Sequence, residues 1–174
     1  MAEAVAAQAP VSASSAPGTR ARVLALLVPA ALLAGAFGSQ YLGHLVPCEM
    51  CWWQRYAHIA AVVLALLAFT APAASSRSRA LVLLAAAAIA VSGGIGFYQA
   101  GVELKIFEGF STCTTTAHGN STAELLKQIM AAPVIRCDQV QWSFLGISMA
   151  GWNAIVSLAS AAVIAVLVMR DRRI

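Results

Sequence analysis

Four long runs of apolar residues dominate the pattern along the chain, at residues 23–46, 51–73, 80–100 and 144–169. A helix needs roughly 20 mostly apolar residues to cross about 30 Å of hydrocarbon, and each run reaches that length. The composition agrees, because 60% of the residues are hydrophobic and only 10% are charged, which is untypical of a soluble domain. We therefore predict an all-α integral membrane protein, a bundle of four transmembrane helices.

The basic residues predict how these helices are oriented. The net charge is +4, and seven of the eleven Lys and Arg residues lie at residues 20–22, 77–79 and 170–173. With four spans these places fall on one side of the membrane, and Lys and Arg in short loops mark the cytoplasmic side. We expect cytoplasmic termini and outer loops at residues 47–50 and 101–143. The charge therefore indicates topology and gives no sign of nucleic-acid binding.

The first residues are rich in Ala, Ser and Pro and show no periodicity, which is typical of a disordered tail. We place this cytoplasmic tail at residues 1–20 and a single transmembrane domain at residues 21–174. An alternative is a secretory signal peptide, because the first apolar run contains Ala34-Gly35-Ala36, a small-residue cleavage pattern. The run continues as far as Val46, which favours a membrane span.

All four cysteines of the chain fall in the two outer loops. Cys48 and Cys51 form a Cys-x-x-Cys pair in the first loop, and Cys113 and Cys137 lie in the second. In a bacterial envelope the outer side is the oxidising compartment, where disulfides form and persist. The four cysteines could form two bridges, for which the sequence allows three pairings.

The close cysteine pair stands at the predicted start of the second helix. There the unpaired N–H groups and the positive end of the helix dipole favour a thiolate at Cys51, the form that attacks disulfides and donates electrons. Arg55 follows one helical turn later on the same face, where it could stabilise that thiolate or an anionic acceptor. It could also be an interfacial arginine beside Trp52 and Trp53, but the nearby cysteine favours the functional interpretation.

The second outer loop has more than forty residues, far more than an ordinary connection, which indicates a function. Within it, residues 121–124 read Ser-Thr-Ala-Glu, the spacing of a helix-capping box, and an apolar face follows before Pro133. That face consists of Leu125, Leu126, Ile129 and Met130. We predict a short amphipathic helix on the membrane surface, although a lid packed on the bundle would have the same pattern.

The sequence carries no motif for a bound electron acceptor. Trp52 follows the cysteine pair where a haem-attachment motif would have His. The glycines at residues 93, 94 and 96 lie in an apolar span and are not part of a nucleotide-binding loop. A lipid-soluble quinone that reaches the cysteine pair from within the bilayer is the simplest acceptor.

Taken together, these features resemble the family of disulfide bond formation protein B (DsbB). The resemblance covers most of the chain beyond the tail, including the order of the spans. Its most specific parts are Pro47-Cys48-Glu49-Met50-Cys51 with Arg55, and Cys137 followed by Trp142, Phe144, Leu145, Gly146, Met149 and Trp152. The resemblance implies a quinone-dependent protein thiol oxidoreductase of the bacterial inner membrane, with its cysteines facing the periplasm.

The resemblance also implies an order of electron transfer. A DsbA-like periplasmic protein of the thioredoxin type would attack Cys113 and form a mixed disulfide. Cys137 would then attack Cys48 and release Cys51 as the thiolate that reduces the quinone, which could be ubiquinone or menaquinone.

Three residues match positions that line the quinone pocket of the family, namely Arg55, Gln40 and Met149. Met149 could equally be a packing residue of the fourth span. The chain departs from the family pattern at Gln99, because many relatives have a histidine in this region. A second departure is Glu49, whose negative charge between the first two cysteines would oppose thiolate formation.

Three rival functions fit parts of the pattern. Four cysteines could bind zinc with His44 or His118 nearby, but a second closely spaced pair is missing. A non-enzymatic tetraspan protein could use two structural disulfides only to brace its loops. An enzyme of the vitamin K epoxide reductase type also has a Cys-x-x-Cys pair, but in that family the pair lies near the last catalytic span. His44, His58 and His118 match no role in the DsbB family, and we expect them to be interfacial or loop residues.

Overall fold

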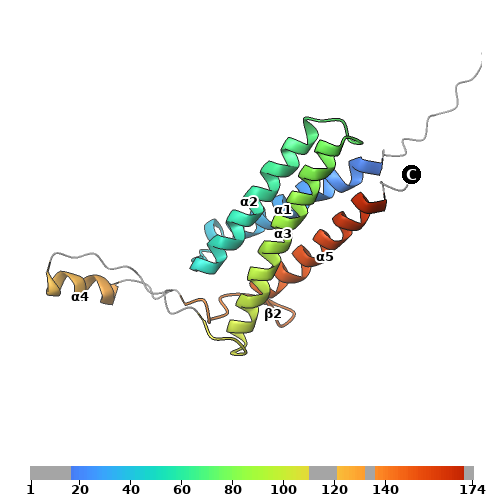
Figure 1. Ribbon diagram of the computed structural model, residues 1–174. Helices are drawn as coiled ribbons and strands as arrows, with labels where there is room; N and C mark the ends of the chain where they lie inside the picture. Colours follow the sequence, from blue (N-terminus) through green and yellow to red (C-terminus); the bar gives the residue numbers. More distant parts are fainter. Residues whose placement is uncertain (1–16, 110–120, 132–135, 171–174) are drawn as a thin grey trace, which may run out of the picture.

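The long helices of the chain pack side by side in a bundle (Figure 1). The computed structural model describes residues 17–109, 121–131 and 136–170. Within these residues, four helices are long and apolar enough to cross a membrane, which confirms the predicted fold class. They are α1 (Pro17–Tyr41), α2 (Glu49–Phe69), α3 (Ser76–Glu103) and α5 (Met149–Arg170).

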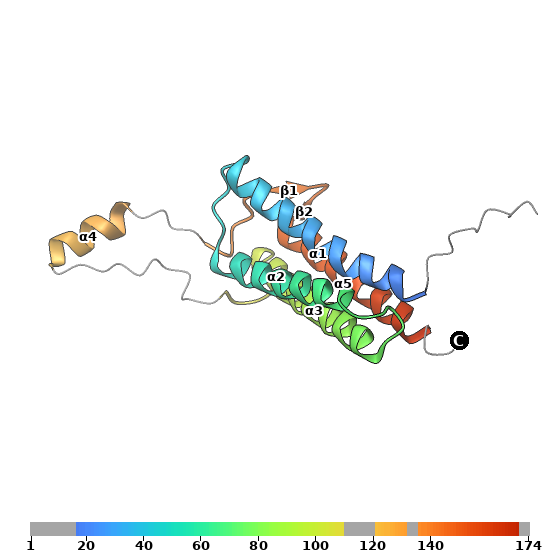
Figure 2. The same cartoon turned by 90° about the horizontal axis from the view of Figure 1, so that it is seen from above.

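Small side chains allow these helices to approach one another closely. In the half of the bundle that holds the start of α1 and the end of α5, the buried core is built largely from alanines of all four helices, together with Ile89 and Ile164. Small residues at contacts are typical of helices that associate within a membrane, where lipid leaves little hydrophobic driving force between them. The helix α3 packs against both α2 and α5, while α1 covers α2 and α5 from another side (Figure 2).

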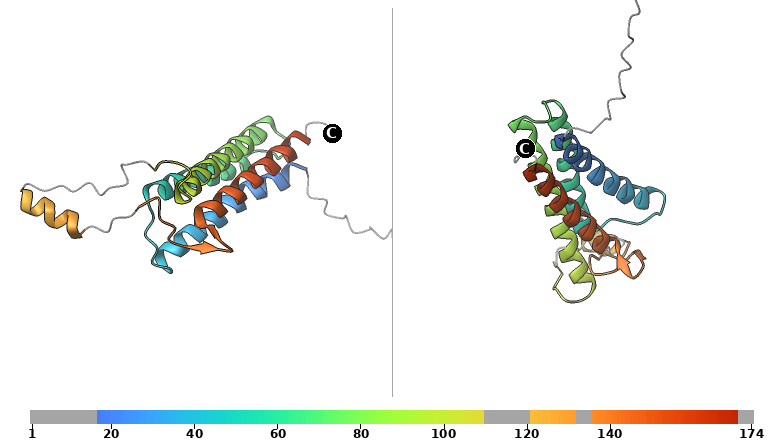
Figure 3. Two further views of the ribbon diagram at one scale, coloured as in Figure 1. Left: turned by 90° about the horizontal axis from the view of Figure 1, so that it is seen from below. Right: turned by 90° about the vertical axis from the view of Figure 1, so that its right-hand side faces the viewer.

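The start of α1 and the end of α5 lie at the same end of the bundle as the connection between α2 and α3 (Figure 3). At this end Arg22 is buried, and its Nε donates a hydrogen bond to Ser78 Oγ over 2.8 Å. The guanidinium also donates to the carbonyl oxygens of Ala68 and Ala71. Arg22 therefore ties α1 to both helices of the α2–α3 pair.

Several predicted boundaries are wrong by a few residues. The first span was predicted at residues 23–46, but α1 begins at Pro17 and ends at Tyr41. Its end is set by Leu42 and Gly43, whose N–H groups both bond to the Gly38 carbonyl, and by His44, which has a φ of 54°. The helix therefore occupies part of the predicted tail, and the rest of that tail lies outside the described residues.

The fourth apolar run also begins with a structure that is not helical. Its first residues form a hairpin of β1 (Ser143–Phe144) and β2 (Ile147–Ser148), which are antiparallel. The connecting residues Leu145 and Gly146 have φ values of 52° and 77°, as a two-residue type I′ turn requires. The helix α5 therefore starts at Met149 and not at Phe144.

The predicted amphipathic helix is present in the second loop as α4 (Thr122–Ala131). Its capping residue is the expected one, because Ser121 Oγ accepts a hydrogen bond from Glu124 N over 3.3 Å. In Figures 1 and 2 this helix stands apart from the bundle.

Candidate functional site

Cys48 and Cys51 lie together at one end of the bundle, opposite the end that holds the start of α1 and the end of α5. We call it the cysteine end. Cys48 caps the N-terminus of α2, and its sulfur accepts a hydrogen bond from Cys51 N over 3.4 Å. The two Sγ atoms are 2.8 Å apart. The contact with the Cys51 thiol, together with burial, raises the pKa of Cys48 far above its ordinary value.

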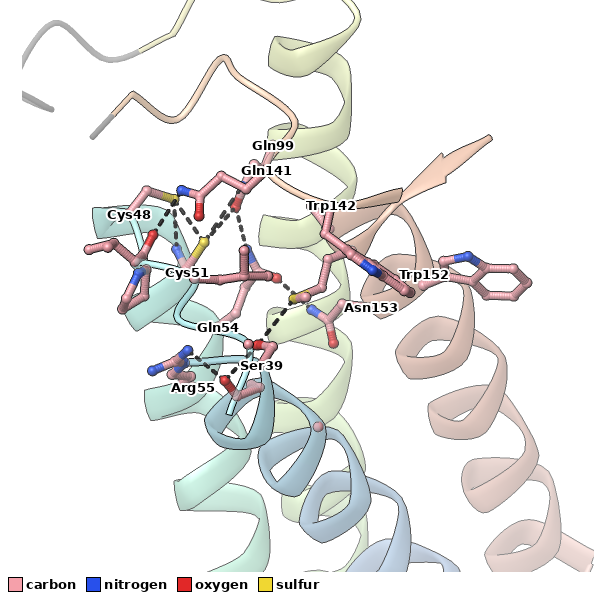
Figure 4. Close-up of a pocket in the computed structure, with 18 of the residues that line it drawn as sticks. Ser39, Cys48, Cys51, Gln54, Arg55, Gln99, Gln141, Trp142, Trp152 and Asn153 are labelled. Carbon is pink, nitrogen blue, oxygen red and sulfur yellow. Dashed lines mark hydrogen bonds between the residues drawn. The ribbon is translucent and has the colours of Figure 1, made fainter. Parts of the chain in front are cut away.

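Cys51 contacts a buried amide from the neighbouring helix. Gln99 of α3 lies with Nε2 at 3.7 Å and Oε1 at 3.9 Å from the Cys51 sulfur. The same Oε1 accepts a hydrogen bond from Gln54 Nε2 over 2.7 Å. Figure 4 shows Cys51 between these two glutamines, at the contact of α2 and α3. Gln99, noted in the sequence only as a departure from the family pattern, is thus part of the site.

Arg55 lies one turn deeper in α2 and is only 5% exposed. It donates hydrogen bonds to Gln40 Oε1 and, over 2.9 Å, to the Ala36 carbonyl. Its guanidinium carbon also lies 4.9 Å from the ring centroids of both Phe37 and Trp52, which is within cation–π range. These contacts hold the charged group against α1, in the wall of a cavity.

A cavity of about 520 Å³ opens between α1, α2, α3 and α5 at the cysteine end. Cys48, Cys51, Arg55 and Met149 all contribute to its wall. On the α1 side the wall is formed by Ser39 and by small and apolar residues, which are Ala31, Leu32, Gly35 and Ala36. A cavity of this volume with a largely apolar wall and a few polar groups is typical of a small-molecule site.

Cys137 is brought to the same place from the second loop. It is 4% exposed and belongs to a buried cluster with Cys48 and Met50. The next residue, Asp138, bonds to Arg136 over 2.7 and 2.8 Å and to Lys105 Nζ over 2.6 Å. These two cations hold the pKa of Asp138 well below the usual carboxyl range, so the contact between the loop and the end of α3 is ionic at neutral pH.

A second contact joins the two loops that carry the cysteines. Gln141 Nε2 donates a hydrogen bond to the Val46 carbonyl over 2.8 Å, close to the start of the Cys48 segment. Trp142 stacks on Phe144 with ring centroids 6.2 Å apart, and Trp152 Nε1 bonds to the Phe144 carbonyl. The loop after Cys137 is thus fixed over the mouth of the cavity, as Figure 4 shows for Gln141 and Trp142.

The structure brings most of the predicted site residues together. Cys48, Cys51, Arg55 and Met149 line one cavity, and Cys137 is in contact range of the first pair. Gln40 is not part of the cavity wall but bonds to Arg55. Cys113 and His118 lie outside the described residues. The exposed residues His44 and Glu49 are at the cysteine end and do not line the cavity.

The sequence interpretation missed a group of buried polar residues below the cysteines. Gln54, Ser92 and Asn153 form hydrogen bonds with one another between α2, α3 and α5. His58 belongs to this group and is 3% exposed, so the expectation of an interfacial or loop residue is wrong for it. The signal that could have revealed the group is the presence of polar residues inside apolar spans, which are rare without a function.

A membrane-embedded bundle with a pair of cysteines at a helix N-terminus, and a third cysteine beside them, defines a membrane thiol–disulfide oxidoreductase. The comparisons with known proteins agree with this class. The family model described as disulfide bond formation protein DsbB matches residues 18–167. The chain belongs to this family, and it is a multi-pass membrane protein that forms disulfide bonds.

Individual relatives extend over most of the chain. A disulfide bond formation protein B of Marinobacter nauticus is 32% identical over 76% of this chain and 80% of its own length. The protein of the same name from Polaromonas sp. is 32% identical over 87% of this chain and 92% of its own. The one from Acidovorax sp. is 34% identical over 87% and 89%, respectively. No solved structure matches the chain.

Proposed function

We propose that this protein reoxidises a DsbA-like periplasmic dithiol protein and passes the electrons to a membrane quinone. The partner loses two electrons and two protons and becomes a disulfide. Electrons enter at Cys113 and Cys137 and leave through Cys48 and Cys51, which return to the disulfide at the end of each cycle. The protein would lie in the bacterial inner membrane with both termini in the cytoplasm and the cysteine end in the periplasm.

The observation that carries this proposal is the shared position of three cysteines and the cavity. Cys137 and Cys48 belong to one buried cluster, and Cys48 and Cys51 form part of the cavity wall. A thiolate at Cys137 could therefore attack the Cys48 sulfur of the oxidised inner pair, forming a new disulfide and releasing Cys51 as a thiolate. The α2 N-terminus favours that charge, and Gln99 Nε2 is directed at the same sulfur.

The residues of the cavity fit a quinone headgroup, either ubiquinone or menaquinone. A bound quinone supplies an acceptor for two electrons and two protons. Arg55 would hold its oxygen with guanidinium N–H groups that Gln40 and Ala36 do not use, since a guanidinium has five donors. Met149 and the apolar residues of α1 would pack against its ring and exclude water from the Cys51 sulfur.

The test is an assay of the purified protein with a reduced DsbA-like protein and a short-chain quinone, followed by quinone absorbance. Cys51→Ser should abolish quinone reduction, because the thiolate that donates the electrons is missing. Cys113→Ser should block oxidation of the partner while the Cys48–Cys51 pair remains oxidisable by quinone. Normal quinone reduction by the Cys51→Ser protein would refute the proposed order of transfer.

The same protein can be tested against the rival in which two disulfides only brace the loops. Bracing disulfides should resist reduction and survive the addition of a partner dithiol. In the proposed cycle, when quinone is left out, one equivalent of reduced partner supplies two electrons and reduces one of the two disulfides, which leaves two free thiols per protein. Full retention of both disulfides under these conditions would favour the bracing function.

A further inference from the structure

A continuous chain of hydrogen-bonded side chains runs from Cys51 into the interior of the bundle. It passes through Gln99 of α3, Gln54 of α2 and Asn153 of α5, and it ends at Ser92 and His58. Four of these side chains are buried, with exposures of 8% or lower, namely Gln54, Gln99, Ser92 and His58. Polar side chains at this depth in a membrane protein are costly unless they are paired, and these are paired with one another.

The orientation of two amides in the chain is fixed by groups that can only accept hydrogen bonds. Asn153 Nδ2 lies 3.2 Å from the backbone carbonyl oxygen of Ser92. Gln54 Nε2 lies 3.2 Å from the backbone carbonyl oxygen of Met50. A carbonyl oxygen has no hydrogen to donate, so neither amide can be turned round without placing two acceptors against each other.

The fixed amides give the chain a single direction. Asn153 Nδ2 donates to Gln54 Oε1 over 2.8 Å, and Gln54 Nε2 donates to Gln99 Oε1 over 2.7 Å. Because its oxygen accepts that hydrogen bond, Gln99 directs its N–H groups at the Cys51 sulfur over 3.7 Å and at Glu103 Oε1 over 3.2 Å. Gln99 Oε1 lies slightly farther from the sulfur, at 3.9 Å, where it accepts from Cys51 while that residue is a thiol. Each of these amides therefore donates its hydrogen bond in the direction of Cys51, and the last N–H group in the series points at the Cys51 sulfur.

Close helix packing holds the deep end of the chain in place. A Cβ atom on Gly96 would lie 2.9 Å from the Ala150 carbonyl oxygen and 3.0 Å from Asn153 Nδ2, so a glycine is needed there for α3 to approach α5. On its other side Asn153 Oδ1 is 3.0 Å from Ser157 Oγ and 2.9 Å from His58 Nε2. Both atoms of the Asn153 amide are thus engaged.

We propose that this amide chain is a positioning device that fixes a hydrogen-bond donor on Cys51 and stabilises the reduced form of the Cys48–Cys51 pair. The inference rests on the proposed function, in which Cys51 is the sulfur released as a thiolate. Hydrogen bonds to a charged acceptor are stronger than those to a neutral one. The Gln99 donor therefore binds the Cys51 thiolate of the reduced pair more strongly than the neutral sulfur of the disulfide, and so it favours the reduced state. A pair stabilised in its reduced state is a stronger oxidant. Gln54 is a positioning residue, because it acts on the sulfur only through Gln99.

The test is a double-mutant cycle on the reduction potential of the inner pair, measured by equilibrium with glutathione in the absence of quinone and partner. Gln99→Met keeps the length of the side chain and removes the donor, and it should lower the equilibrium constant for oxidising glutathione about tenfold, which equals about 30 mV. Gln54→Met should lower it about threefold, because Gln99 is then free to turn. The double variant should match Gln99→Met alone, since Gln54 has no other route to the sulfur.

The control is Ser160→Ala, which removes a hydrogen bond to the Ser157 carbonyl. Ser160 is on the same helix as Asn153 but does not belong to the hydrogen-bonded series of side chains that leads to Cys51. This variant should leave the constant unchanged. If Gln54→Met does not accumulate in membranes, Gln54→Glu keeps the shape, replaces the donor by an acceptor and should lower the constant at least as far. Additive effects of the two glutamine variants, or an unchanged constant in Gln54→Met or Gln54→Glu, would overturn the proposal. Failure of the wild-type protein to reduce quinone would instead refute the proposed function.

Discussion

Replacing Arg55 with Met should weaken quinone use, because it removes a buried guanidinium from the wall of the cavity. Arg55 is held by Gln40 and by the Ala36 carbonyl, and its guanidinium carbon lies 4.9 Å from the ring centroids of both Phe37 and Trp52. Methionine retains much of the apolar contact with these rings but has no N–H group to offer a quinone oxygen.

The magnitude follows from the hydrogen bond that is lost. A hydrogen bond to a charged group contributes about 1.5 to 3 kcal/mol, and about 1.4 kcal/mol corresponds to a tenfold change in affinity. The apparent KM for a short-chain quinone should therefore rise roughly 10- to 100-fold. Arg55→Lys keeps the charge and loses the planar fork of donors, so its KM should fall between those of the wild type and the Met variant.

The assay is the initial rate of quinone reduction at a fixed, saturating concentration of reduced partner, with the quinone concentration varied. Arg77→Met is the matched control, because Arg77 is an exposed arginine at the opposite end of the bundle. An unchanged KM in Arg55→Met would refute the role in quinone binding. Arg55 would then be an anchor that ties α2 to α1.

Two further predictions concern the segment around the cysteine end. The pKa of Asp138 is lowered by the hydrogen bonds from Arg136 and Lys105, so the ionic contact between these residues is fully present at neutral pH and is lost as the pH falls through that lowered pKa. Asp138→Asn should remove this contact at neutral pH and make proteolysis of the loop faster. Equal cleavage rates in the variant and the wild type would contradict this. Gly101→Ala would place a Cβ only 2.2 Å from Phe107 Cδ2 and should destabilise the protein by roughly 1 to 3 kcal/mol, measured as a lower midpoint of thermal unfolding. A midpoint equal to that of the wild type would show that the Phe107 ring moves aside without cost.

The sequence predicted the helices well because burial in lipid requires long apolar runs, which are visible without any structure. It predicted their ends less well, because a helix can stop inside an apolar run. The segment around Leu45 is apolar, yet α1 ends before it, and the apolar residues Phe144 and Leu145 form a hairpin. These ends depend on the positive φ values of His44, Leu145 and Gly146, and only Gly146 is of a residue type that signals such a conformation.

The cysteine part of the site was predictable because its residues follow one another at fixed spacing. Cys48, Cys51 and Arg55 lie within three turns of the start of one helix, so periodicity alone places them on neighbouring positions. Cys137 lies far along the chain, and its position beside Cys48 depends on ionic contacts of Asp138 that no spacing rule contains.

The amide chain could not be predicted in this way, for a physical reason that also bears on its role. Its members come from three helices, and in each helix a single Gln or Asn among apolar residues looks like an isolated defect. Only the packing of α2, α3 and α5 brings these polar side chains within hydrogen-bond distance of one another. The hydrogen bonds then offset the cost of burying each side chain. Gln54 bonds to partners on both other helices, so replacing it leaves Gln99 Oε1 and Asn153 Nδ2 each without one partner. The sequence shows each polar residue inside its span but not the pairing between them. Because of that pairing, the state of the Cys51 sulfur is sensitive to residues that never touch it.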